Sequence, residues 1–228
     1  MRLLLVASRF PWPPRRGNQA RTVEWLEALA EHESVLVAPE PPTPGLRHEL
    51  ERRRVGFVPY RLAVPTRLFG VLVAALRGWP LQEGLYRTRS GLDAVRAALT
   101  AGPSDLMVVQ MQRCGWAVEA LREAAPQVPF LFDAIDAMGL HYQRTEVLFA
   151  AALRPLVRLE AARCRRRERQ LASAAAVTTA VSSVDLEFLQ AGGVGRVVPV
   201  SGRERDLASR NVSWPTVLLS GNLGYRPT

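Results

Sequence analysis

The chain has 228 residues, of which 48% are apolar and 22% charged, so its composition predicts a packed globular body rather than a disordered chain. Its formal net charge is +9 and its sequence pI is near 10.9, which suits negatively charged partners. All 30 basic side chains counted as Lys or Arg are arginine, so most of this charge reflects composition along the whole chain. A basic nucleic-acid-binding protein is an alternative, disfavoured because no reader motif or aromatic-interleaved basic patch is present.

The two cysteines and the apolar runs indicate in which cellular compartment the protein is expected. Cys114 and Cys164 stand in no metal-binding or redox spacing, which favours a reduced, cytoplasmic protein. The longest apolar stretch, residues 68–76, is shorter than the roughly 20 residues needed to span a bilayer. The N-terminal apolar run is too short for a signal peptide. We therefore expect a cytoplasmic protein without a transmembrane helix.

Short apolar runs alternate with helical patterns along the chain, starting with one βαβ unit in residues 2–39. This alternation predicts an α/β fold with a doubly wound, Rossmann-like parallel sheet. Strands are expected at residues 3–7, 35–38, 55–59, 106–110, 129–133, 176–181 and 196–200. Helices are expected at residues 19–31, 46–53, 66–76, 90–100, 117–125, 146–172 and 184–190.

The loop after the first strand is the most informative segment. Gly17 would let the backbone approach a pyrophosphate or an acceptor hydroxyl, and Asn18 is a candidate N-cap of the following helix. Cations are disfavoured at a helix N-terminus, so arginines crowded there indicate an anion site. An ordinary turn with solvated arginines is the alternative. The arginines are Arg9, Arg15, Arg16 and Arg21, of which Arg21 is the candidate donor to the ligand.

Acids and polar residues follow two later strands. Asp133 ends the strand expected at residues 129–133 and Asp136 follows it, at the edge where open α/β sheets bind ligands, so we consider both as catalytic carboxylates. Structural capping is the alternative for each. Gln110 and Arg113 end the preceding strand and are candidate acceptor-binding residues.

With these pieces in place, the chain resembles the N-terminal half of a GT-B glycosyltransferase, most closely the retaining family-four transferases of exopolysaccharide type. The segments that carry the resemblance are RLLLVASRFPWPPRRGNQARTVEWLEALAEH, VPFLFDAIDAM, AAAVTTAVSSVDLEFL and TVLLSGNLGYRPT. The resemblance implies two Rossmann-like domains, with the acceptor on the N-terminal one and the nucleoside-diphosphate sugar on the other. It implies no metal and no cofactor, and it aligns Asp136 with a residue that faces the donor sugar.

The resemblance also divides the chain. It implies an acceptor-side domain at residues 1–203, a linker at 204–215 and, at 216–228, the start of a truncated nucleotide-sugar-binding domain. Gly221 and Asn222 resemble a loop that lies near the donor phosphates in relatives. Because the rest of that domain is absent from the sequence, activity of these residues alone is not expected.

The expected function is transfer of a sugar, of hexosyltransferase type, to a saccharide or lipid-linked acceptor. The alternative is a non-catalytic Rossmann-like module that binds an acceptor or a polyanion. The basic helix expected near residues 156–172 allows peripheral contact with an anionic membrane on the inner face of the plasma membrane. A solvated helix with Glu–Arg pairs is the alternative there. No nucleic-acid partner is expected.

Overall fold

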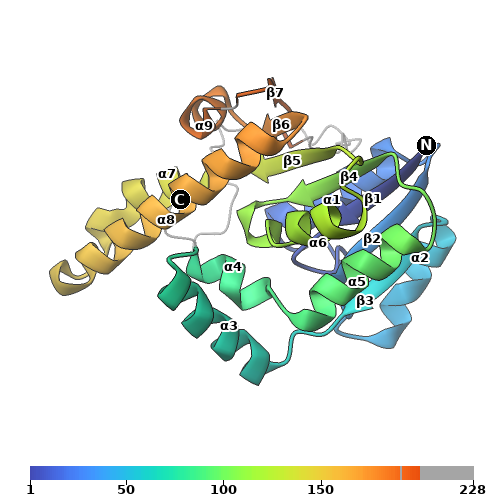
Figure 1. Cartoon of the computed structure of the whole chain (residues 1–228), viewed down its shortest axis with the longest axis horizontal. Coiled ribbons are helices and arrows are strands. Elements are labelled where there is room, and N and C mark those ends of the chain that lie inside the picture. The colour runs from blue at the N-terminus through green and yellow to red at the C-terminus, as the bar shows by residue number, and fades with distance from the viewer. Residues whose placement is uncertain (191, 201–228) are drawn as a thin grey trace, which may run out of the picture.

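The computed structural model describes residues 1–190 and 192–200, and its centre is one sheet of parallel strands (Figure 1). The strand order is β3-β2-β1-β4-β5-β6-β7, so the chain winds outward from β1 in one direction and then from β4 in the other. This reversal defines a doubly wound fold and confirms the predicted class. The strands are β1 (Arg2–Val6), β2 (Glu33–Pro39), β3 (Gly56–Tyr60), β4 (Leu106–Gln110), β5 (Phe130–Ile135), β6 (Val177–Ala180) and β7 (Val194–Val197).

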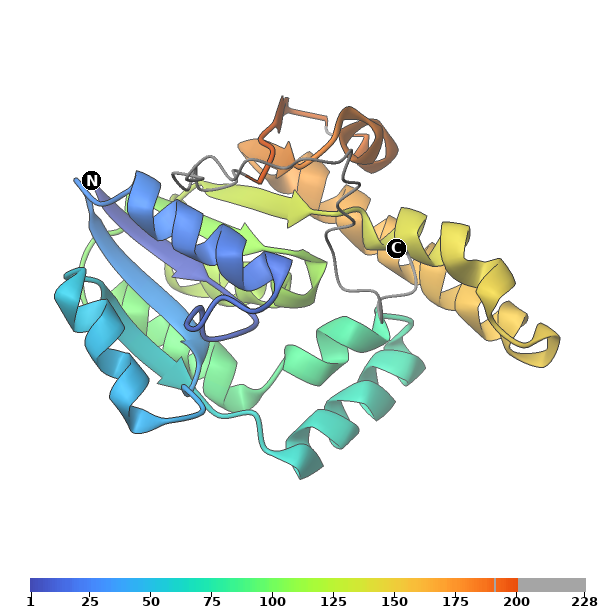
Figure 2. The ribbon, with the colours of Figure 1, turned by 180° about the vertical axis from the view of Figure 1, so that it is seen from behind.

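The two faces of the sheet are covered by different helices, because strands buried on both sides need apolar partners on each. One face packs under α1 (Gly17–Ala28) and α2 (His48–Arg52), seen in front of the sheet in Figure 2. The larger core lies on the other face, beneath α5, α6, α8 and α9. These helices are α5 (Arg89–Thr100), α6 (Ala117–Ala124), α8 (Arg154–Ala174) and α9 (Ser183–Leu189).

Two helical pairs extend beyond the sheet. The first pair is α3 (Val64–Arg77) with α4 (Leu81–Tyr86), which cross so closely that Gly70 and Gly84 touch through their backbones. The second pair is α7 (Met138–Thr145) with α8, visible at the left of Figure 1. Among the described residues no helix is both long and apolar enough to cross a membrane.

All seven predicted strands are present, but two helical predictions are wrong and two helices were missed. The helix expected at 146–172 begins only at Arg154, since Pro155 occupies its first turn and two short 3-10 turns precede it. Neither α4 nor α7 was predicted. The N-cap of α1 is Arg16 and not Asn18, which lies inside the helix. The predicted linker and the beginning of a second domain, residues 204–228, lie outside the described residues, as do Gly221 and Asn222.

A candidate functional site at the carboxyl edge of the sheet

The loop after β1 is held down by its aromatic residues. Phe10 and Trp12 are 4% and 6% exposed and pack edge to face, with ring centroids 6.0 Å apart. The Arg53 guanidinium lies over the Trp12 ring, 4.8 Å from its centroid. The aromatic residues are buried, whereas Arg15 and Arg16, which follow them in the loop, are exposed.

The start of α1 has no internal anion partner among the described residues. The N-cap, Arg16, makes no side-chain capping hydrogen bond, and the first turn contains no acidic residue. Gly17 is exposed, and a side chain added there would meet no atom within 4 Å. The space beside Gly17 is therefore open, at the positive end of the helix dipole.

Three arginines gather beside this helix end. The pKa of Arg9 is lowered, first by burial and then by the positive charges of Arg16 and Arg113, while the nearby Tyr86 works in the opposite direction. The Arg113 guanidinium lies over the Tyr86 ring, 5.7 Å from its centroid. The Nε atoms of Arg9 and Arg113 are buried and have no hydrogen-bond partner. Within the described residues no carboxylate forms an ion pair with Arg9, Arg16 or Arg113.

A cleft of about 710 Å³ opens at the same edge, over the ends of β1, β2 and β3. Its acid, Glu40, is already paired with Arg47 at 2.6 Å, so the net charge of the cleft wall is positive. The Nε atom of Arg67, at the start of α3, is buried here without a partner. The residues that line it include Arg9, Phe10, Arg15, Gln19, Arg67 and Tyr86.

Three of the sequence-predicted residues lie beneath this edge rather than on it. Arg21 is 3% exposed and donates from Nε and Nη2 to the carboxylate of Asp133, at 3.2 Å each. Asp133 is fully buried and also accepts hydrogen bonds from Trp25 Nε1 and Thr179 Oγ1, both at 2.7 Å. Gln110 is likewise fully buried, and its Oε1 accepts a hydrogen bond from a threonine of α1. These groups tie α1 to β4, β5 and β6.

Asp136, by contrast, is exposed just after β5. Its pKa is raised, mainly because the surrounding protein desolvates it and secondly because of the nearby carboxylate of Asp185. His141 and Arg113 act in the opposite direction. The pKa of His141 is lowered by burial, partly offset by Asp136. Asp136 therefore belongs to an electrostatically coupled group that includes Arg113, and burial shifts its pKa in the direction that favours the protonated form.

The loop that carries Asp136 is fixed by two other acids, which the sequence analysis did not identify. Asp185 of α9 accepts a hydrogen bond from the N–H of Ala137 at 3.1 Å. Glu168 of α8 accepts from the N–H groups of Met138 and Gly139 at 2.6 and 3.0 Å. Together they satisfy the free N–H groups at the start of α7. Burial raises the pKa of Glu168 to about 7.

Backbone strain marks the same edge. Met111 follows β4 with φ 61° and ψ 155°, and Ile135 ends β5 with φ 61°. Such angles are unusual for residues with side chains, and each costs on the order of 1–3 kcal/mol. The two residues pack in one small cluster with Met138 and Cys164. Strain at the ends of adjacent strands is typical of ligand-binding edges.

The structure thus divides the predicted residues into two groups. Gly17, Asn18, Arg113 and Asp136 lie at the carboxyl edge, whereas Arg21, Asp133 and Gln110 are buried supports below it. Arg67 and Tyr86 were missed because the α3–α4 pair that presents them was not fully predicted. No group of three His, Cys, Asp or Glu side chains suited to a metal ion occurs in the described part of the chain.

Comparison with known proteins shows that the fold of this chain is similar to that of solved structures. No protein-family model matches the chain, and no curated protein sequence is significantly similar. Sucrose-phosphate synthase from Thermosynechococcus elongatus superposes with a TM-score of 0.55 at 13% identity, over 87% of this chain and 48% of that one. A UDP-glucosyltransferase from Polygonum tinctorium gives 0.52 at 13% identity, over 88% and 52%.

The chain therefore spans about half the length of these two solved structures. The likeness confirms the predicted Rossmann-like fold, in the form found in GT-B glycosyltransferases. In open sheets of this kind, ligands bind at the carboxyl ends of the strands, which is where the cationic cleft lies.

Proposed function

We propose that the chain is the acceptor-side domain of a GT-B glycosyltransferase that transfers a hexose from a nucleoside-diphosphate sugar. The acceptor is a saccharide or a lipid-linked saccharide, and no metal or cofactor takes part. The finer parts of the proposal are the retaining outcome, the family-four relationship and a role in polysaccharide synthesis. They rest on the sequence resemblance and on the fold shared with two named glycosyltransferases.

One observation carries the proposal: the uncapped start of α1 converges at one edge of the sheet with Arg9, Arg16 and Arg113, none of which has a carboxylate partner among the described residues. Backbone N–H groups and arginines are the donors that bind phosphate oxygens best. In sugar transfer, a diphosphate leaves with an additional negative charge. Fixed cations around it would stabilise that charge in the transition state without a metal ion.

The cleft over β1–β3 fits the acceptor side of such a reaction. Its wall combines the apolar ring of Phe10 with polar groups that include Gln19, and sugars need both kinds of contact. Asp136 lies at the same edge, where it would orient or deprotonate the acceptor hydroxyl. The buried Arg21–Asp133 pair would support this edge from below.

We further propose that the domain works in the cytoplasm, in peripheral contact with an anionic membrane. The support comes from α3, whose apolar side chains are exposed and unusual for a surface helix. Leu68, Phe69, Leu72 and Leu76 are 65%, 67%, 56% and 80% exposed. Arg77 ends this helix, so apolar and cationic groups occur together, as in helices that lie in a membrane interface.

The proposal is tested by isothermal titration of the chain with UDP, GDP and the corresponding nucleosides. A nucleoside diphosphate should bind more tightly than its nucleoside, and added salt should weaken it. Arg9→Gln/Arg113→Gln should abolish that difference. The matched control is Arg89→Gln/Arg144→Gln, which removes the same charge at exposed positions outside the cleft.

Transfer itself is measured as nucleoside diphosphate released from a panel of nucleotide sugars with saccharide and lipid-linked acceptors. The assay is run on this chain and on a longer product that carries a second domain. Release only from the longer product agrees with the proposal. Oligosaccharide binding without diphosphate binding or release from either protein would support the non-catalytic binding module instead.

A further inference from the structure

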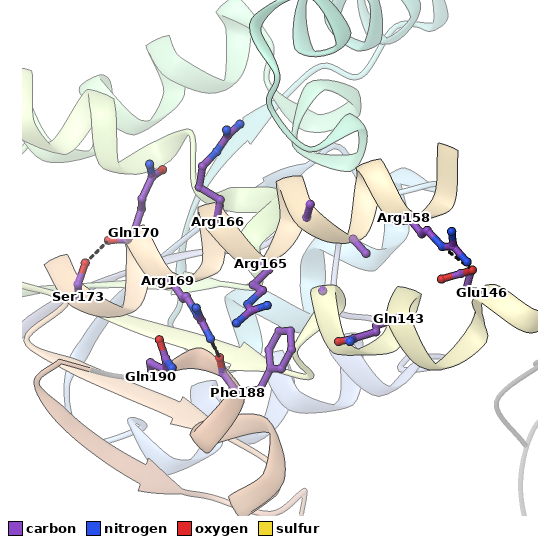
Figure 3. Close-up of a pocket in the computed structure, with 13 residues that line it drawn as sticks. Gln143, Glu146, Arg158, Arg165, Arg166, Arg169, Gln170, Ser173, Phe188 and Gln190 are labelled. Atoms are coloured by element: carbon purple, nitrogen blue, oxygen red, sulfur yellow. Dashed lines mark hydrogen bonds and ion pairs between the residues drawn. The ribbon is translucent and has the colours of Figure 1, made fainter. Parts of the chain in front are cut away.

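A second cavity lies away from the cleft, against α8. It has a volume of about 850 Å³ and is bounded by α7, α8 and α9 (Figure 3). Gly139 forms part of its floor, where a side chain would collide with the backbone of Arg165, 2.9 Å away. The close contact of α7 with α8 therefore depends on this glycine. The cavity has no part in the sugar-transfer proposal.

Two arginines of α8 share this cavity. Arg165 and Arg169 are one helical turn apart and both point toward Phe188 of α9, as Figure 3 shows. Their guanidinium carbons lie 5.5 and 5.9 Å from the centroid of the Phe188 ring. Arg169 also donates to the Phe188 carbonyl oxygen at 3.4 Å. Two long side chains are thus positioned by one ring before any ligand binds.

These positive charges lack compensation. Like charges four residues apart on a helix destabilise it, and the pKa of Arg169 is lowered, first by desolvation and then by Arg165. Within the described residues neither guanidinium has a carboxylate partner. The acid in the cavity wall, Glu146, is paired with Arg158 at 2.8 Å.

Two further wall residues have neutral side chains that can form hydrogen bonds. Gln143 of α7 and Gln190 after α9 reach the cavity from opposite sides of the two arginines. Arg166 also borders the cavity, but its side chain points away and donates to the Gly78 carbonyl at the end of α3. The arginines of α8 therefore make two kinds of contact. Arg165 and Arg169 face the cavity, whereas Arg166 binds the end of α3.

From this arrangement we propose that the cavity between α7, α8 and α9 binds a phosphate group through Arg165 and Arg169. Two guanidinium forks side by side match the oxygens of a phosphate, which accepts several charge-assisted hydrogen bonds. The amide groups of Gln143 and Gln190 would complete the shell. The phosphate belongs either to a soluble ligand or to the headgroup of an anionic lipid.

Titration of the chain with tripolyphosphate tests the soluble source. The wild-type chain should show a site that Arg165→Gln/Arg169→Gln weakens by at least about tenfold, because two charge-assisted contacts are lost. Arg89→Gln/Arg144→Gln is again the control of equal charge. Arg9→Gln/Arg113→Gln should leave this site intact, so failure here is distinguishable from failure of the nucleotide site.

Arginine modification locates the site without any substitution. Phenylglyoxal labels accessible arginines, and mass spectrometry of the peptides reads each position. Tripolyphosphate, or vesicles that contain phosphatidylglycerol, should protect Arg165 and Arg169 while leaving Arg89 and Arg144 reactive. Because this measurement uses the wild-type chain, it tests the site even if the double variant folds poorly.

Co-sedimentation with phosphatidylcholine vesicles, with and without phosphatidylglycerol, tests the lipid source. Loss of binding in Arg165→Gln/Arg169→Gln but not in the control assigns the site to a lipid headgroup. Loss of tripolyphosphate binding alone assigns it to a soluble phosphate. If the double variant matches its control in both assays and neither probe protects the two arginines, the proposal is wrong.

Discussion

Arg21 of α1 and Asp133 of β5, 112 positions apart in the sequence, form a bidentate ion pair inside the protein. Their side chains are 4% and 0% exposed, so neither charge is solvated by bulk water. The pair is completed by Trp25 and Thr179, which donate to the same carboxylate. A charge pair enclosed in this way fixes the position of α1, and with it the loop that carries the cationic cluster.

Removing one partner of this pair should be costly. Asp133→Ala leaves the guanidinium of Arg21 buried without its main partner, and we expect a loss of about 3–5 kcal/mol in the free energy of unfolding. Arg21→Ala should cost less, because Asp133 keeps hydrogen bonds from Trp25 and Thr179. Urea unfolding of the two single variants and the double variant measures both costs and their coupling.

The exposed pair Arg96–Glu123 gives the comparison for that experiment, since Glu123→Ala should scarcely change the unfolding midpoint. Equal, small effects of Asp133→Ala and Glu123→Ala would contradict the structural role of the buried pair. Arg21 remains a predicted ligand donor as well. A well-folded Arg21→Ala protein with weakened diphosphate binding would favour that role.

Gly17→Ala tests whether a ligand approaches the start of α1, because it should affect ligand affinity but not the stability of the fold. A methyl group there meets no atom within 4 Å, so we expect no loss of stability and a slight gain, since alanine suits a helix better. If a diphosphate approaches the start of α1, the same methyl group stands in its path, and affinity for the nucleoside diphosphate should fall about tenfold. Thermal unfolding and isothermal titration measure the two effects.

Gly45→Ala provides the control for this substitution, because Gly45 also has open space around it but lies outside the first turn of α1. An identical affinity for the Gly17 and Gly45 variants would mean that the ligand does not approach the helix N-terminus.

The order of strands and helices was accessible from the sequence because buried parallel strands appear as apolar runs of recognisable length. Local patterns also indicated which loop would be cationic. The sequence pattern did not show that the Arg21 side chain would be buried, because its partner, Asp133, lies on a strand that is distant in the sequence. One-dimensional spacing likewise gave no reason to separate Asp133, which is fully buried, from Asp136, which is exposed.

The missed helices have a physical explanation as well. Gly78 and Pro80 interrupt the pattern around α4, and Gly84 is a poor helix former taken alone. Only the tertiary contact with Gly70 explains that glycine, because any side chain at either position would collide with the backbone of the other helix. The positive φ angles of Met111 and Ile135 could not be predicted either, because nothing in the local sequence indicates them.

The exposed apolar face of α3 predicts binding to anionic vesicles. Leu72→Ser/Leu76→Ser should reduce co-sedimentation with phosphatidylglycerol vesicles, because it removes apolar surface that would enter the interface. Stability should be nearly unchanged, as both leucines are exposed in the folded protein. Val194→Ser is the control. Val194 is 46% exposed and lies on β7, the edge strand at the opposite side of the sheet from β3, which precedes α3. Equal vesicle binding by all three proteins would exclude α3 as the contact.

In the longer product that carries a second domain, Asp136→Asn should lower the rate of transfer by about 10²–10⁴-fold, the usual contribution of proton transfer, without altering stability. The pKa of Asp136 should fall in Asp185→Asn, which removes a nearby negative charge, and rise in Arg113→Gln, which removes a positive one. Carbon-13 NMR titration of labelled aspartate carboxyls measures both shifts in this chain. Shifts of opposite sign, or wild-type transfer rates in Asp136→Asn, would remove Asp136 from the site.

Glu168 makes the stability of the fold depend on pH in a window that can be stated in advance. Its pKa is raised from 4.5 to about 7, chiefly by burial, although the N–H groups of Met138 and Gly139 oppose the shift. Between these pH values the folded protein keeps a proton that the unfolded chain releases. The folded state therefore binds more protons, and the free energy of unfolding falls as the pH rises through this window.

The full loss is about 3 kcal/mol, from the difference between the folded and unfolded pKa values. Glu168→Gln removes the titration and keeps an oxygen for one of the two N–H groups, so its stability should decline less between pH 4.5 and 7. Urea unfolding at several pH values, with the exposed Glu187→Gln as control, measures the difference. Parallel curves for the wild type and Glu168→Gln would show that the carboxyl is already ionised at the start of α7, where the dipole favours its charge.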